Sequence, residues 1–235
     1  MARLLLAAAG LGLASGETYY VSPLGSDSAP GTAEHSAWLT LGAASHRLAN
    51  GDSLLLQRGG MWLDDWLNTS ASGLTVGAYG PGTAPAPLIQ HGRPLGDAPG
   101  SHACLHFSSP DGLTVSDLHL SGCSGGLQLA GPPARPAEPF AASAKGVVIE
   151  RIFWNDIRTP FLLYSPPNPR WASAISMTGG FKDFTLRNCV AVRIDVFFRS
   201  SAHIDGMHLD SNTVQQCSGN CYALGSGTKL VMENR

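Results

Sequence analysis

The sequence predicts an all-β protein folded as a parallel β-helix, and the clearest sign is a pattern repeated near its C-terminus. Segments starting at Phe184, Met207 and Leu230 each carry an apolar–x–apolar triplet, with steps of 207 − 184 = 23 and 230 − 207 = 23 residues. Self-similarity at a fixed period of this size marks a solenoid. The repeats lack the long helical signals of helix-pair repeats, which favours coils built from short β-strands.

The same triplet occurs upstream at longer intervals. It starts at Leu74, Leu113 and Val147, with steps of 113 − 74 = 39, 147 − 113 = 34 and 184 − 147 = 37 residues. We interpret each longer step as one coil plus an inserted loop, because solenoids accept insertions on one face without breaking the stack. Proline-rich stretches, which cannot form a central strand, indicate loops at 131–145 and 165–181. Residues 74–235 therefore predict about five coils.

Residues at a fixed distance from each triplet start should stack inside the coils. The starts and the fifth, tenth and fourteenth residues after them are apolar or Cys in fifteen of sixteen cases, for the starts at 113, 147, 184 and 207. Asn212 is the exception, and its amide would need hydrogen-bond partners if buried. Trp154 shares a column with Leu120 and Ala191, so we expect it inside. The fourteenth-residue column consists of Leu127, Phe161, Phe198 and Cys221.

Residues 17–62 are expected to form a strand and a cap before the first coil. Residues 18–22 are rich in β-branched and aromatic residues and predict a strand, and residues 53–60 predict a strand followed by a turn. Apolar residues recur at helical spacing over 38–49, which predicts a short amphipathic helix there. Such a helix would cover the apolar stack and the strand edges at the open end of a solenoid.

The N-terminus resembles a secretory signal peptide over residues 1–16. Arg3 precedes an apolar run from Leu4 to Ala14, followed by small residues suited to cleavage. The run is too short to span a bilayer, and a buried N-terminal helix is the alternative interpretation. We therefore expect a secreted chain of residues 17–235 with no membrane span. Asn68 would then lie in an N-glycosylation sequon on a surface loop.

Composition and cysteine count narrow the possible partners. The net charge of −2 argues against a nucleic-acid partner, which would require a basic face. Five cysteines leave at least one unpaired in an oxidising compartment. Cys104 with Cys123, or Cys217 with Cys221, could form disulfides, and stacked free thiols are the alternative. No Cys/His spacing matches a zinc site.

The start of the expected mature chain carries motifs that resemble a known superfamily. They are Tyr19–Pro23 with Gly25–Thr32, Trp38–Leu41, and Gly51–Gly59. Together they are similar to the opening of secreted right-handed parallel β-helix proteins of the pectin-lyase-like superfamily. The resemblance implies a right-handed solenoid but selects no activity, because members include lyases, hydrolases, epimerases and proteins without known catalysis. The polygalacturonase-like Asn-x-Asp, Asp-Asp and Gly-His-Gly set is missing.

The resemblance also implies a groove walled by inserted loops, here over the coils that start at 147, 184 and 207. Nine residues after these starts lie Asp156 and Arg193, and eleven after lie Arg158 and Asp195. We expect Asp156 to stack on Arg193 and Arg158 on Asp195, either as substrate-binding groups or as ordinary surface ion pairs. Trp171 lies in a loop and is the candidate for stacking on a sugar ring.

The sequence predicts a carbohydrate-active protein that acts on or binds an acidic, uronate-containing polysaccharide. As an enzyme it would act by a lyase-like elimination. Arg199 or Arg193 would bind the carboxylate, and Lys182 or His203 would serve as base. Alternatives are a glycoside hydrolase that uses Asp156 and Asp195, and a non-catalytic glycan-binding or adhesion module. Ca²⁺ stays open as a cofactor, although the dense Asp clusters of pectate lyases are missing.

The last repeat stops at Arg235, five residues after its start. An open stack of coils exposes strand edges, so a complete β-helix needs a C-terminal cap. We therefore expect a chain truncated at the C-terminus, with further coils beyond Arg235, and the alternative is that another chain covers this end. Otherwise we expect a monomer.

Overall fold

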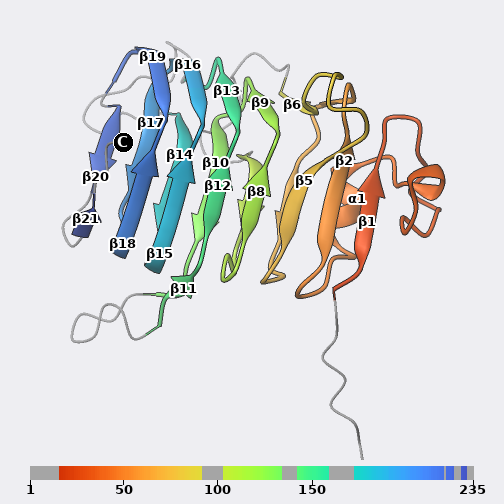
Figure 1. Ribbon diagram of the computed structural model, residues 1–235, viewed down its shortest axis with the longest axis horizontal. Coiled ribbons are helices and arrows are strands. Elements are labelled where there is room, and N and C mark those ends of the chain that lie inside the picture. The colour runs from red at the N-terminus through yellow and green to blue at the C-terminus, as the bar shows by residue number, and fades with distance from the viewer. Residues whose placement is uncertain are drawn as a thin grey trace, which may run out of the picture.

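The computed structural model describes residues 16–91, 103–133, 142–158, 172–219, 221–224 and 229–231. Among them, nearly all regular structure is β, arranged in three parallel sheets. The helices are η1 (Glu34–Ser36), a 3-10 turn, and α1 (Leu41–Ser45). Successive coils stack along one axis (Figure 1). The predicted fold class, a parallel β-helix, is confirmed.

Each coil passes through the three sheets in the same order, here called A, B and C. Sheet A contains the predicted triplets and runs from β1 at the N-terminal end to β21. Every strand pair in it is parallel, so side chains one coil apart are neighbours. Its strands are β1 (Thr18–Val21), β2 (Ser53–Gln57), β5 (Thr75–Tyr79), β8 (Thr114–Ser116), β12 (Val148–Glu150), β15 (Gly180–Arg187), β18 (His203–Asp210) and β21 (Lys229–Val231), with β11 (Ala144–Lys145) beside β15.

Sheets B and C follow sheet A in each coil and have six strands each. Sheet B consists of β3 (Met61–Leu63), β6 (Leu88–Gln90), β9 (His119–Ser121), β13 (Phe153–Asn155), β16 (Val190–Ile194) and β19 (Thr213–Cys217). Sheet C consists of β4 (Leu67–Thr69), β7 (Ala103–Phe107), β10 (Gly125–Ala130), β14 (Ser173–Thr178), β17 (Val196–Ser200) and β20 (Tyr222–Leu224).

The predicted stacking is confirmed in sheets A and B. Phe184 pairs with Met207, and Met207 pairs with Leu230, in one file of parallel strands. Trp154 is fully buried, between Leu120 and Ala191. These apolar side chains fill the interior, since burial of apolar surface is the main force that favours folding.

Asn212 breaks the apolar pattern of the interior and is satisfied locally. Its Oδ1 accepts from Cys189 N at 3.0 Å, and its Nδ2 donates to Leu186 O at 2.8 Å. The amide therefore meets the condition expected for a polar group in an interior column.

The predicted column in sheet C is wrong for two of its four members. Leu127 pairs with Ile175 and Ile175 with Phe198, whereas Phe161 lies outside the described residues. Phe198 then pairs with Tyr222, one residue beyond the expected Cys221. The expected loop at 165–181 is therefore wrong in part, because β14 occupies residues 173–178. The insertion in this coil comes before sheet C, so counting from the triplet start fails beyond it.

The N-terminal helix is shorter than predicted. The helical spacing over 38–49 includes Trp38, which forms a parallel bridge with Val21, and Thr40, which caps α1 by accepting from Ala43 N at 3.0 Å. Asp27 explains part of the resemblance motif, because its carboxylate accepts from Leu39 N and Thr40 N, both at 2.9 Å. Those hydrogen bonds hold the backbone just before α1 in the position from which the helix starts.

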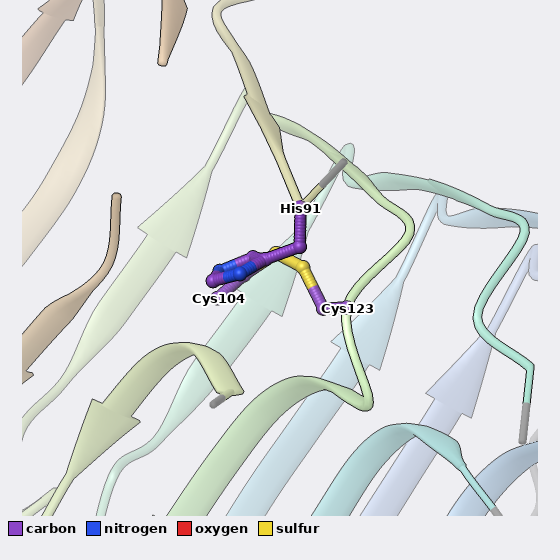
Figure 2. A group of neighbouring side chains, drawn as sticks. All are labelled: His91, Cys104 and Cys123. Atoms are coloured by element: carbon purple, nitrogen blue, oxygen red, sulfur yellow. A yellow bond between two sulfur atoms is a disulfide. The ribbon is translucent and has the colours of Figure 1, made fainter. Parts of the chain in front are cut away.

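A disulfide links Cys104 and Cys123, whose Cα atoms lie 5.8 Å apart. The ring of His91 lies beside the sulfur atoms (Figure 2). The alternative pairing is not present, since Cys217 and Cys221 are free thiols. The disulfide connects the start of β7 to the turn before β10, and so joins adjacent coils inside the solenoid.

Candidate functional site

A row of polar side chains runs along the outer face of sheet C, one from each of five neighbouring strands. In each of these strands the two flanking side chains are buried and the middle one points outward. Because strands of a sheet lie about 4.8 Å apart, the row has that spacing along the solenoid axis. The members, here called the sheet C row, are Asn68, His106, Gln128, Ser176 and Arg199.

The N-terminal end of the sheet C row carries no charge at neutral pH. Oδ1 of Asn68 lies 2.9 Å from Nδ1 of His106, in hydrogen-bond contact. Burial lowers the pKa of His106, which keeps its ring neutral near pH 7. Arg199, exposed at the other end, supplies the cation of the row, and no carboxylate of the described residues pairs with it. The row therefore combines neutral hydrogen-bonding groups with one guanidinium.

The loops expected at 131–145 and 165–181 as walls of a groove lie in part outside the described residues.

The corner between sheets B and C holds the predicted stack of Asp156 and Arg193. Both residues have positive φ, 57° and 54°, as a tight corner requires. Arg193 Nε and one terminal nitrogen donate to the two carboxylate oxygens of Asp156, each at 2.7 Å. This bidentate contact lowers the pKa of Asp156. The sequence-based stack is confirmed, and it forms a mutually neutralised pair.

Arg158 and Asp195 lie next to this pair. Arg158 Nε donates to the backbone oxygen of Arg193 at 3.3 Å. Asp195 is almost fully buried and accepts from Ser218 Oγ at 2.7 Å, and Ser218 stands eleven residues after its triplet start as expected. The described contacts thus give both side chains structural partners.

Among the three residues predicted to be catalytic, the structure separates Lys182 from Arg199. Arg199 is on the outer face of sheet C, but Lys182 and His203 belong to sheet A, on β15 and β18. Lys182 is exposed and pairs in register with Asp205. His203 begins β18, just past the turn that follows Arg199. Arg199 therefore faces a different side of the solenoid from Lys182.

Trp171, the predicted sugar-stacking residue, lies outside the described residues. Among the described residues Trp66 is the tryptophan with an exposed side chain, and it stacks on His91 with ring centroids 6.3 Å apart. The sequon residue Asn68 is exposed as expected, although it lies on strand β4 and not on a loop.

Sequence reasoning missed most of the sheet C row. Gln128 and Arg199 both stand fifteen residues after their triplet starts, so the same counting could have paired them. Ser176 could not be found that way, because the insertion before β14 shifts its number. His106 precedes the triplet at Leu113 and lies in the coil that starts at Leu74, where the step to the next triplet is 39 residues.

A cation site is not evident at the sheet C row. Among the described residues, the group of three His, Cys or carboxylate side chains close enough to share an ion is His91, Cys104 and Cys123. It offers none of the oxygen ligands that Ca²⁺ prefers. In the described part of the chain, no helix has the length and apolar character needed to cross a membrane.

Solved structures that align with this chain include carbohydrate-active enzymes. A native GH136 lacto-N-biosidase from Eubacterium ramulus aligns with a TM-score of 0.63 and 16% identity over 86% of this chain and 42% of that chain. Its selenomethionine derivative gives 0.62 and 17% over 89% and 43%. A rhamnogalacturonan lyase gives 0.46 and 11% over 93% and 66%. At such identities the likeness shows the fold alone, and the chain spans less than half the length of the lacto-N-biosidase. Neither a protein-family model nor a curated protein matches the chain.

Proposed function

We propose that this chain belongs to a carbohydrate-active protein that binds an acidic polysaccharide along the sheet C row. The observation that carries the proposal is the row itself, an unbroken line of polar side chains over five coils. It follows the solenoid axis at about 4.8 Å per strand, so successive sugars of an extended polymer can each meet one or two side chains.

The charge of the sheet C row favours an acidic sugar. Arg199 presents a planar, bidentate donor that fits a uronate carboxylate, and the described residues provide no competing carboxylate. The neutral His106, Gln128 and Ser176 are hydrogen-bonding groups suited to hydroxyls. A similar fold in a lacto-N-biosidase supports a carbohydrate ligand in general.

For the reaction, we propose lyase-like elimination first and hydrolysis second. Elimination needs Arg199 to neutralise the uronate and a base nearby, and His203, four residues later across one turn, is the nearer of the two sequence candidates along the chain. Hydrolysis by Asp156 and Asp195 is supported by the glycoside hydrolase among the similar folds. Arg193 keeps Asp156 ionised, which suits a base or nucleophile. A non-catalytic glycan-binding module remains the alternative.

Binding is tested with polygalacturonate, alginate and a neutral galactan as ligands in isothermal titration calorimetry. We expect the acidic polymers to bind and Arg199→Ala to weaken that binding about tenfold or more, since a charge-assisted hydrogen bond is lost. Lys182→Ala, an exposed cation on sheet A, is the matched control and should bind normally. Loss of binding with Lys182→Ala but not with Arg199→Ala would show that the binding site is on sheet A.

Catalysis is tested on the same polymers, with and without Ca²⁺. An ultraviolet-absorbing unsaturated product indicates elimination, and new reducing ends without that absorbance indicate hydrolysis. His203→Ala should abolish the first activity, and Asp195→Asn the second. Binding without either product would establish the non-catalytic module.

We further propose that the chain is secreted and glycosylated at Asn68, which leaves the members of the sheet C row from His106 to Arg199 for the polysaccharide. The apolar run before residue 15, the disulfide and the exposed position of Asn68 support this. Expression in a eukaryotic secretory host should yield a medium-borne protein whose mass falls after N-glycosidase treatment, and Asn68→Gln should remove that shift.

A further inference from the structure

The N-terminal end of the solenoid is covered in two of its three sheets. In sheet A, β1 pairs with β2 and extends the sheet by one strand before the first full coil. In sheet C, α1 lies against β4, and Ser45 Oγ of α1 accepts from Asn68 N at 2.9 Å. In sheet B, β3 is the last strand, and no strand of the described residues pairs with its other edge. The N-terminal end of the solenoid therefore has an uncovered gap beside β3.

Two residues of β3 direct their backbone N–H and C=O groups into that gap. In a parallel strand, alternate residues direct both backbone groups to the same side. Leu88 N donates to Gly60 O at 3.0 Å and Asp64 N donates to Gln90 O at 2.9 Å, so the even-numbered residues face β6. Met61 and Leu63 consequently direct their N–H and C=O groups to the open edge, ready for another strand.

A groove of about 400 Å³ lies along this edge. Trp62 Nε1 donates to Leu39 O at 3.0 Å, and this hydrogen bond holds Leu39 in place as the wall of the groove opposite β3. The side chains of Met61 and Leu63 are 51% and 60% exposed, high values for large apolar groups. The side chains that matter for a ligand are Pro23, Leu39, Met61, Leu63, Asp64 and Asp65.

We propose that the β3 groove binds an extended peptide segment of a partner protein, which adds a strand to sheet B. Backbone hydrogen bonds to an open strand edge are a general mode of peptide recognition. The apolar lining suits β-branched side chains of the peptide. Asp64 and Asp65 line the groove and no basic residue does, so the lining is acidic although the Asp65 carboxylate also accepts from Leu41 N and Gly42 N. We therefore expect the peptide to carry Lys or Arg.

The size of the groove argues for a peptide and against a second copy of this chain. A stable protein–protein interface uses about 20–30 residues a side. The open edge of β3 is three residues long, and the lining comprises eight residues. A single extended segment matches these dimensions.

The test uses a fluorescein-labelled peptide, acetyl-Lys-Thr-Val-Thr-Val-Thr-Lys-amide, in fluorescence anisotropy with the full chain. We expect saturable binding, and none with the fully N-methylated peptide, which lacks the backbone donors. Replacing both lysines by glutamate should also abolish binding. Failure of the parent peptide to bind, or equal binding of the N-methylated one, overturns the proposal.

Two matched variants locate the site. Leu63→Lys places a cation at the groove and should weaken binding about tenfold or more. Val190→Lys places the same charge on the outer face of β16, whose two edges are both paired, and should leave binding unchanged. Light scattering is run in parallel. A dimer that Leu63→Lys dissociates would show a second copy in the groove and overturn the assignment to a partner peptide.

Discussion

The corner between sheets A and B and the sheet C row both present polar side chains stacked coil upon coil, but they use them differently. At the corner, Arg58 and Arg151 pair with Asp117 at 3.4 and 2.9 Å, and Arg187 pairs with Glu150 at 2.6 Å. Arg151 also contacts Glu150, which joins the two groups into one network. Each charge there is matched by a neighbour in the same coil or one or two coils away.

The sheet C row has no such matching within the described residues. Its one cation, Arg199, faces outward without a carboxylate partner, and its other members are neutral. The comparison teaches that stacking alone does not distinguish structural from functional polar groups in a solenoid. The distinction lies in whether adjacent coils satisfy each other's charges. We therefore expect corner substitutions to change stability and sheet C substitutions to change binding.

The largest effect on stability is expected for Glu150→Gln. Glu150 is buried and accepts from Arg187 and Arg151, so removing its charge should cost about 2 kcal/mol of the free energy of unfolding. Urea unfolding measures the change. Asp210→Asn, an exposed position one coil beyond Arg187 in the same column, should change it by less than about 0.5 kcal/mol. Equal effects would refute the corner network.

Acid should weaken the same corner. Burial alone would raise the pKa of Glu150, but the hydrogen bonds and charges of Arg187 and Arg151 outweigh it and hold the pKa below its ordinary value of 4.5. A lowered folded-state pKa gives stability that is present above the unfolded value and lost as pH falls through the folded one. Urea midpoints should therefore decline below pH 4.5, and less steeply in Glu150→Gln. If the urea midpoint declined equally steeply with falling pH in the unsubstituted protein and in Glu150→Gln, Glu150 would be excluded as a cause of the acid destabilisation.

The Asp156–Arg193 pair should matter less. Its side chains are 42% and 45% exposed, and exposed ion pairs contribute about 0–1 kcal/mol. Asp156→Asn should therefore lower the free energy of unfolding by less than about 1 kcal/mol, and high salt should shrink the difference further. A loss as large as that of Glu150→Gln would contradict the assignment of this pair as a surface contact.

Arg199→Ala should have the smallest effect on stability. The side chain is exposed and unpaired by any described carboxylate, so the free energy of unfolding should change by no more than about 0.5 kcal/mol. The same variant is expected to lose acidic-glycan binding, which reverses the pattern of Glu150→Gln. Urea unfolding and calorimetry on one preparation make the comparison direct.

Much of the fold could be predicted from the sequence because a solenoid converts sequence spacing into spatial proximity. The 23-residue step placed Phe184 on Met207, and the same frame placed Trp154 inside and Asp156 on Arg193. These predictions hold wherever no insertion intervenes, since the strand pairs there are parallel and stack residues at the same place in each coil.

The sequence by itself determined the stack of sheet A, its interior, and the neighbours at the corner between sheets B and C. Only the tertiary structure decided that an insertion precedes β14, that Ile175 follows Leu127, and that α1 begins at Leu41 after the Trp38 bridge. It also separated Arg199 from Lys182. The reason is that insertions preserve the parallel stack while they destroy the count, so which residues share a face depends on where each chain re-enters its sheet.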